Sequence, residues 1–111
     1  MFWKTKKTQK IELTENGFQI IYNKDFIQFE WKEIQRLTGF KIDKLTIDDI
    51  CLKIESENNI FSVTEEFVGW RLFINQILIE FPEIDKNWEG KVALPPFERK
   101  ETELYKRKNV G

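Results

Sequence analysis

The chain has 111 residues, enough for one domain with its own hydrophobic core. Hydrophobic residues make up 41% of it and charged residues 33%, and eighteen Lys and Arg against nineteen Asp and Glu leave a net charge of −1. A balance so close to zero argues against a surface that attracts nucleic acid or an anionic membrane as a whole. We therefore expect no nucleic-acid partner and no stable membrane insertion.

The numbers of cysteine and histidine residues limit which disulfides, catalytic bases and metal sites the chain can form. Cys51 is the only cysteine, which excludes an internal disulfide and favours a reducing compartment. The chain has no histidine, so the usual general base and the commonest zinc ligand are missing. No apolar run reaches the roughly 18 residues of a membrane span, and the opening MFWKTKKTQK lacks the apolar core of a secretory signal. These features predict a cytoplasmic protein without a cofactor.

In chain order, residues 1–9 are basic and aromatic, and we expect a flexible N-terminus there. A membrane-binding or single-stranded nucleic-acid-binding arm is the alternative. Residues 10–64 alternate between apolar and polar with regularly spaced turn residues, as in an antiparallel meander. Ile34, Phe40 and Ile42 share one face if Gly39 introduces no bulge. The predicted strands cover residues 10–13, 18–22, 26–31, 33–43, 47–55 and 60–64.

A single helix is predicted over Glu65–Phe81, with Thr64 as its N-cap and Pro82 ending it. Glu65 and Glu66 would then favour the positive end of the helix dipole. At about 100° per residue the helix carries two apolar stripes, whereas a helix lying on a core needs only one. The broad stripe, predicted to be core, is Phe67, Trp70, Ile74, Ile77, Leu78 and Phe81; the outer stripe is Val68, Leu72 and Ile79.

Residues 82–111 are predicted to form an extended wrap that ends in a charged tail. The segment from Trp88 to Phe97 is too apolar to lie in water, so two interpretations remain open. In the first, the segment folds back over the outer stripe and completes the core. In the second, stripe and segment form a docking surface for a second copy or another protein. The predicted interaction surface comprises Val68, Leu72, Ile79, Trp88, Leu94 and Phe97.

Six or seven antiparallel strands followed by one Trp-bearing helix resemble the pleckstrin-homology-like fold. The resemblance covers roughly residues 11–81 and rests on the order of elements and on Glu66, Trp70 and Ile74. It implies a binding module, since some members hold phosphoinositides, many hold peptides, and catalysis is rare. The first hairpin loop, Glu15–Gly17, is short and acidic where lipid-binding members cluster Lys and Arg, so we expect no phosphoinositide binding. The segments WKEIQRLTGFKID, TIDDICLKI, VTEEFVGW and VALPPFE are also similar to small uncharacterised bacterial proteins.

Two groups of residues carry the remaining chemistry. Cys51 shares a strand face with Asp49 and Lys53, and a thiolate there would need a positive neighbour such as Lys41, Lys44 or Lys53. Asp43, Asp48 and Asp49 bracket a turn, but their spacing matches no calcium-binding loop, and acids in loops are usually solvated. We therefore predict neither a catalytic residue nor a metal site.

Together these observations predict one α+β domain: a bent antiparallel sheet or partial barrel, closed by one C-terminal helix, with an extended C-terminal tail. The function predicted first is a non-enzymatic protein-interaction or regulatory module whose partner is another protein or a second copy. The alternative is a carrier of a small apolar ligand or lipid, held in a pocket between sheet and helix. An enzyme using Asp48, Asp49 or Cys51 with a metal comes third.

Overall fold

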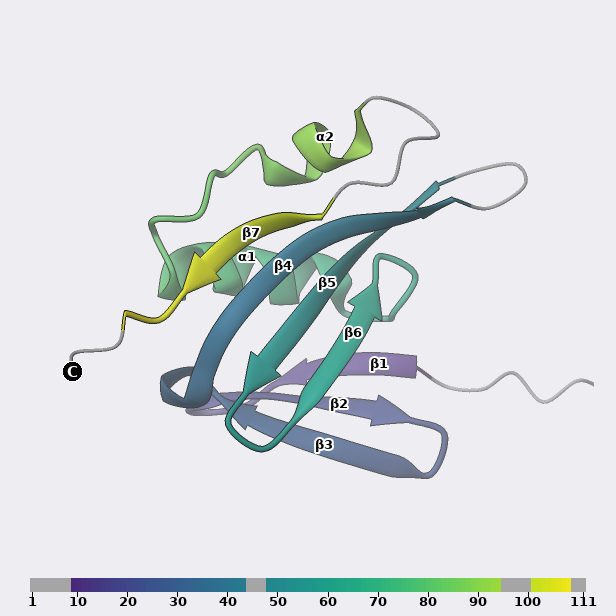
Figure 1. Cartoon of the computed structure of the whole chain (residues 1–111). Coiled ribbons are helices and arrows are strands. Elements are labelled where there is room, and N and C mark those ends of the chain that lie inside the picture. The colour runs from purple at the N-terminus through teal and green to yellow at the C-terminus, as the bar shows by residue number, and fades with distance from the viewer. Residues whose placement is uncertain (1–8, 44–47, 95–100, 109–111) are drawn as a thin grey trace, which may run out of the picture.

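Two antiparallel sheets and two helices make up the fold (Figure 1). The computed structural model describes residues 9–43, 48–94 and 101–108. The three-stranded sheet has the order β1-β2-β3, and the four-stranded sheet has the order β6-β5-β4-β7. The elements are β1 (Gln9–Leu13), β2 (Gly17–Tyr22), β3 (Asp25–Glu30), the 3-10 turn η1 (Trp31–Glu33), β4 (Ile34–Asp43), β5 (Asp48–Ser56), β6 (Ile60–Thr64), α1 (Trp70–Glu80), α2 (Trp88–Ala93) and β7 (Thr102–Lys106).

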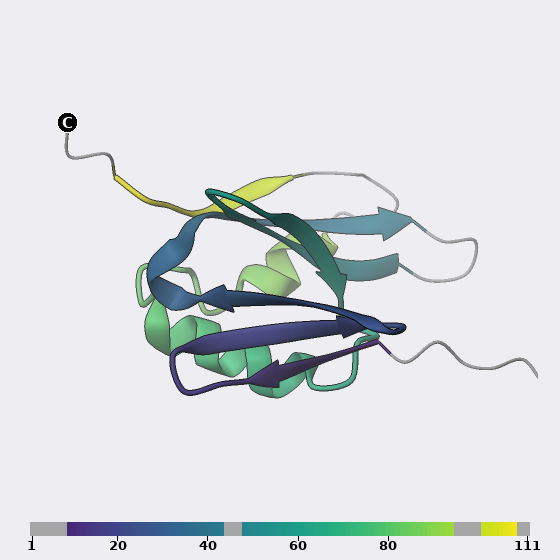
Figure 2. The same cartoon turned by 90° about the horizontal axis from the view of Figure 1, so that it is seen from below.

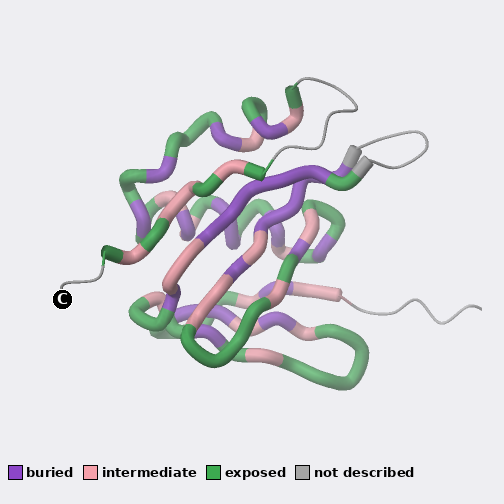
Figure 3. The backbone as a smooth tube through the Cα atoms, in the orientation of Figure 1, coloured by how far each residue is buried: buried purple, intermediate pink, exposed green. Residues whose placement is uncertain are grey.

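Both helices lie on the same side of the four-stranded sheet, and α1 also runs beside the three-stranded one (Figure 2). Phe18 of β2 lies at the junction of the layers: its ring centroid is 4.7 Å from that of Phe73 on α1 and 5.0 Å from that of Trp31 in η1. Residues 37–41 of β4 are buried on both faces (Figure 3). The α+β class with antiparallel strands is confirmed. The predicted single bent sheet or partial barrel is replaced by two separate sheets, and the described strands do not close into a barrel.

The six strands predicted within residues 10–64 are confirmed, with ends that differ by at most one residue. Gln9 belongs to β1 and not to the predicted flexible N-terminus; the rest of that prediction lies outside the described residues. The prediction that Ile34, Phe40 and Ile42 share a face is wrong. The register of β4 against β5 shifts between Ile34 and Arg36, and one extra residue in a strand moves the following side chains to the opposite face.

Gly39 does not form the bulge; its lack of a side chain makes room for a residue that packs on β4. A Cβ built on Gly39 would lie 2.8 Å from the ring of Trp88, so only glycine lets the indole lie directly on β4. This contact brings α2 onto the inner face of the sheet. The position of the glycine is therefore explained by a residue 49 positions further along the chain, which no local pattern reveals.

The predicted start of the helix at Glu65 is wrong, because α1 begins at Trp70. The backbone before it is bonded to β1 instead: the Val68 N–H donates to the Gln9 carbonyl at 3.0 Å, and the Ile11 N–H donates to the Val68 carbonyl at 2.8 Å. Gly69 then turns the chain into the helix with φ of +91°. Glu65 does not serve the helix dipole, because its carboxylate accepts a hydrogen bond from the Ile50 N–H at 3.0 Å.

Thr64 is likewise not the N-cap of α1, which has Gly69 at that position and no side-chain cap. The helix ends before Pro82 as predicted, but at Glu80, with Phe81 as its C-cap, and so one residue earlier than the predicted end.

The prediction of an extended C-terminal wrap is wrong for the described part of residues 82–111. Trp88 and Val92, four residues apart, are both buried and form the inner face of α2. Further along, β7 pairs antiparallel with β4 and becomes one edge of the four-stranded sheet. The chain is thus closed by two helices and a late strand, not by one helix and a tail.

Gly69→Ala is expected to destabilise the fold by about 1–3 kcal/mol, because a Cβ there would lie 2.3 Å from the Ile11 carbonyl oxygen at a φ that side chains rarely adopt. Urea unfolding followed by tryptophan fluorescence measures the loss. Gly90→Ala is the matched control, since Gly90 is exposed on α2 with nothing within 4 Å of an added Cβ. Its stability should stay unchanged or rise by up to about 1 kcal/mol; equal losses in the two variants would contradict the steric explanation.

Candidate functional site

The predicted interaction surface does not come together as one surface. Val68, Leu72 and Ile79 are 67%, 69% and 68% exposed, so no described part of the chain covers the outer stripe. Leu94 is also exposed, at the end of α2, whereas Trp88 is only 2% exposed and belongs to the core. Phe97 lies outside the described residues. The fold-back interpretation is therefore wrong for the described tail, and so is the placement of Trp88 on a docking surface.

The path of α2 explains why the described part of the tail does not cover the outer stripe. The Glu89 carboxylate accepts hydrogen bonds from the Trp70 indole N–H at 3.1 Å and from the Arg71 guanidinium at 2.8 and 3.0 Å. This carboxylate raises the pKa of Arg71 above its ordinary value. The rings of Trp70 and Trp88 lie 6.3 Å apart. Glu89 thus holds α2 beside the first turn of α1, on the sheet side.

The outer stripe of α1 is narrow. Leu72 and Ile79 are two turns apart, and the exposed polar residues Arg71 and Asn75 lie around and between them. Single exposed aliphatic side chains are common on soluble proteins and do not by themselves mark an interface. The role of the outer stripe as an interaction surface therefore stays a prediction.

The residues considered for chemistry are divided between the two faces of the four-stranded sheet. Cys51 is fully buried, and its thiol lies 3.6 Å from the Asp49 carbonyl oxygen. Lys41 is paired with Ile50 and so lies on the opposite face of the sheet from Cys51, where its Nζ donates to the Ala93 carbonyl at 3.1 Å. Among the described residues, no three His, Cys, Asp or Glu side chains gather in a way that could hold a metal ion. The side chains of Asp43 and Asp48 lie outside the described part.

The open edge of β6 is the better candidate. Two backbone hydrogen bonds mark the ends of the β5–β6 ladder. The Glu65 N–H donates to the Ile50 carbonyl at 2.9 Å, and the Ser56 N–H donates to the Asn59 carbonyl at 2.8 Å. Because bonded pairs alternate with non-bonded pairs in an antiparallel ladder, the backbone groups of Phe61 and Val63 point to β5. Those of Ile60 and Ser62, and the N–H of Thr64, point away from the sheet.

Among the four edge strands of the described structure, β6 is the only one without a charge. Edges are normally protected by charged residues, proline or a covering segment. β3 carries Asp25 and Glu30, β7 carries Glu103 and Lys106, and the Val68 segment covers β1. β6 reads IFSVT, with neither charge nor proline. It is therefore the edge best suited to accept another strand.

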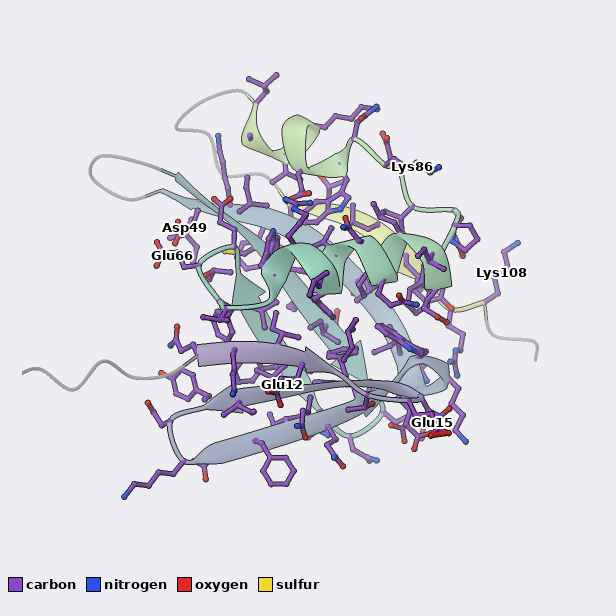
Figure 4. All side chains as sticks on the ribbon, turned by 180° about the vertical axis from the view of Figure 1, so that it is seen from behind. Glu12, Glu15, Asp49, Glu66, Lys86 and Lys108 are labelled. Carbon is purple, nitrogen blue, oxygen red and sulfur yellow. The ribbon has the colours of Figure 1, made fainter. Side chains whose placement is uncertain are left out.

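A groove of about 480 Å³ opens beside this edge. One wall is the end of the three-stranded sheet, where the Tyr22 ring lies 6.2 Å from that of Phe61 on β6. Asp49 and Glu66 lie near one another at the end of the groove where β6 leads into the following loop (Figure 4). The lining residues are Gln9, Tyr22, Ile42, Asp49, Phe61, Ser62, Thr64, Glu66 and Phe67.

The sequence analysis treated residues 60–64 only as the last of six predicted strands and missed this site. The one available signal was the uncharged IFSVT between turn residues. The groove itself joins β1, β2, β4, β5, β6 and the loop before α1, so no local pattern announces it.

Comparison of the chain with protein-family models, with curated proteins and with solved structures finds no match. None of the helices described is long and apolar enough to cross a membrane. A function for this chain has to be argued from its own surface.

Cys51 is expected to react with a thiol reagent such as DTNB on the order of 100-fold more slowly in the native protein than in 6 M urea, because the sulfur is fully buried. Absorbance of the released thiolate gives the rate. Native labelling as fast as that of the unfolded chain would contradict the burial and reopen a redox role for the cysteine.

Proposed function

We propose that this chain is a non-enzymatic protein-interaction module that binds an extended segment of another protein as an added strand along β6. The observation that carries the proposal is the uncharged open edge of β6, where the outward backbone groups of Ser62 border a groove. Strand addition draws affinity from backbone hydrogen bonds and specificity from pockets for alternate side chains. The outward groups of β6 would supply the hydrogen bonds, and the groove beside Ser62 offers room for a side chain of the added strand.

The order of elements supports the same function. The resemblance to the pleckstrin-homology-like fold rests on this order, in which six strands are followed by α1 with Trp70 in its first turn. Many members of that fold hold peptides. Fold analogy alone is a weak argument for function, so the edge and the groove carry the proposal.

A second copy fits the edge less well than a different protein does. If two copies paired antiparallel about Ser62, Glu66 of one copy would lie opposite Asn58 of the other, next to Glu57. Acidic groups would then meet neutral or acidic ones, and such a pair gains nothing from charge. We therefore assign the edge to a heterologous partner.

The carrier hypothesis has less support. The space between the sheets and α1 is occupied by packed rings: Phe18 contacts Phe29 and Phe73 with centroids 5.1 and 4.7 Å apart, and Trp31 lies 6.2 Å from Phe81. An apolar ligand bound there would have to displace them. Organic extraction of the purified protein followed by mass spectrometry tests the carrier hypothesis directly.

Selection of random octapeptides on the immobilised full-length chain is expected to enrich binders that slow amide hydrogen exchange at Ser62, whose N–H points outward from the free edge. Ser62→Pro removes that donor without touching the β5 ladder and should weaken binding by about tenfold, the worth of a good hydrogen bond. Titration by NMR gives both the affinity and the location.

Ser62→Thr is the matched control, since it retains the N–H, and it should bind like the parent chain. Leu72→Glu alters only the outer stripe of α1 and should have no effect. If Leu72→Glu abolished binding and Ser62→Pro left it unchanged, the binding site would lie on the outer stripe and the proposal would be overturned. Circular dichroism confirms that each variant is folded.

A further inference from the structure

A cavity of about 220 Å³ lies between α2, β7 and the loop that joins α1 to α2 (Figure 1). Its apolar wall consists of Trp88 and Val92 on α2 and Leu104 on β7. Trp88 and Val92 are buried, and Leu104 is half-buried. An apolar protein cavity of about 150 Å³ is large enough to bind benzene. The cavity beside α2 therefore has room for a molecule with one ring.

The indole of Trp88 brings a hydrogen-bond donor to this wall. Its Nε1 is buried and has no hydrogen-bond acceptor among the described residues. The Trp70 indole, by contrast, donates to Glu89 at 3.1 Å. Buried side-chain donors in native proteins are nearly always bonded to protein, water or a ligand. The Trp88 N–H is therefore a donor that a bound molecule would satisfy.

The packing of the indole fixes the direction of this N–H. Atoms Cε3 and Cζ3 of Trp88 approach Gly39, each 2.8 Å from a Cβ built there, and Leu104 lies beside them, 3.3 Å from the same Cβ. Nε1 is on the opposite long edge of the indole and so points away from this contact. The ring also packs against Trp70, with centroids 6.3 Å apart. Because these contacts hold the ring, the N–H cannot turn to another acceptor without disrupting them.

An organic ligand suits this donor better than a water molecule does. A buried water needs two to four polar partners. The wall around the Trp88 indole is formed by Val92 and Leu104, which offer none from their side chains. A ligand with an apolar ring and a single acceptor would match both the wall and the donor.

The charged residues of the lining exclude an anionic ligand. Glu83, Asp85 and Glu103 line the cavity with only one basic residue, Lys91, and all four are exposed. Lys91 already donates a hydrogen bond to the Asp85 carboxylate. A carboxylate or phosphate that entered here would meet like charges. The acceptor that reaches Trp88 is therefore a neutral one, such as a carbonyl oxygen.

We infer that this chain binds a small neutral molecule, one ring with a carbonyl group, in the cavity between α2 and β7, where the carbonyl oxygen accepts a hydrogen bond from the Trp88 indole. The site lies beside β7, at the opposite edge of the four-stranded sheet from β6. It is also separate from the packed space between the sheets and α1. The inference therefore stands or falls independently of strand addition.

The test is an NMR titration with three probes of nearly equal size: acetophenone, α-methylstyrene and benzoate. All three contain a phenyl ring, which carries a carbonyl in the first, a methylene in its place in the second, and a carboxylate in the third. Acetophenone should shift the Trp88 indole proton downfield and saturably, because a hydrogen bond forms, and α-methylstyrene should not. Benzoate should bind at least about tenfold more weakly than acetophenone, because its charge meets the acidic lining. Triple-resonance and NOE spectra assign the proton.

Thr102→Phe should abolish the acetophenone shift. Thr102 lines the cavity and is paired with Gly39, so its side chain lies on the face that Trp88 contacts, and a ring there would fill the space. Lys106→Phe is the matched control at the other end of β7, outside this lining, and should retain the shift. Circular dichroism confirms that both variants are folded.

The inference is overturned if the Trp88 indole proton does not respond to acetophenone, or responds equally to α-methylstyrene, because the N–H is then not the donor. A response that persists in Thr102→Phe also overturns it, because the ligand then binds elsewhere. Benzoate that binds as tightly as acetophenone contradicts the assignment of a neutral ligand.

Discussion

The two backbone hydrogen bonds between Val68 and β1 are the constraint on which the rest of the structure depends. They bind the chain that leaves β6 to the first strand of the other sheet, and so join the two sheets at one corner. They also delay the helix to Trp70, because a backbone committed to β1 cannot begin a helical ladder. Gly69 is required at the switch between the two conformations. The groove exists because the loop that makes this connection stands beside the free edge of β6.

The C-terminal residues complete the opposite side of the four-stranded sheet. Glu89 holds α2 against α1, Trp88 lies on Gly39, and β7 pairs with the outer side of β4. One edge strand of the sheet is therefore β7, which is charged and whose Glu103 forms an ion pair with Arg36 of β4 at 3.5 Å. The other edge strand is β6, which carries no charge. This difference in charge between the two edge strands is what makes β6 distinctive.

An uncharged open edge is a hazard for a soluble protein, since it offers a template for nonspecific strand pairing. A strand from a partner that paired with β6 would remove this hazard, because it would satisfy the outward backbone groups of Ser62. The hazard and the proposed function thus rest on the same feature of the edge.

The sequence by itself determined the local elements. Period-2 alternation and turn residues located six strands, Pro82 located the end of α1, and the broad stripe of Trp70, Ile74 and Ile77 is core as predicted. These predictions were confirmed because each depends on residues close together in the sequence and on one buried face of a strand or helix. Only the tertiary structure decided where residues 65–69, α2 and β7 lie, since each is fixed by partners distant in sequence: Gln9, Gly39 and β4. The candidate site falls in this second class, because the uncharged pattern of β6 is visible in the sequence but the position of β6 at the edge of the sheet is not.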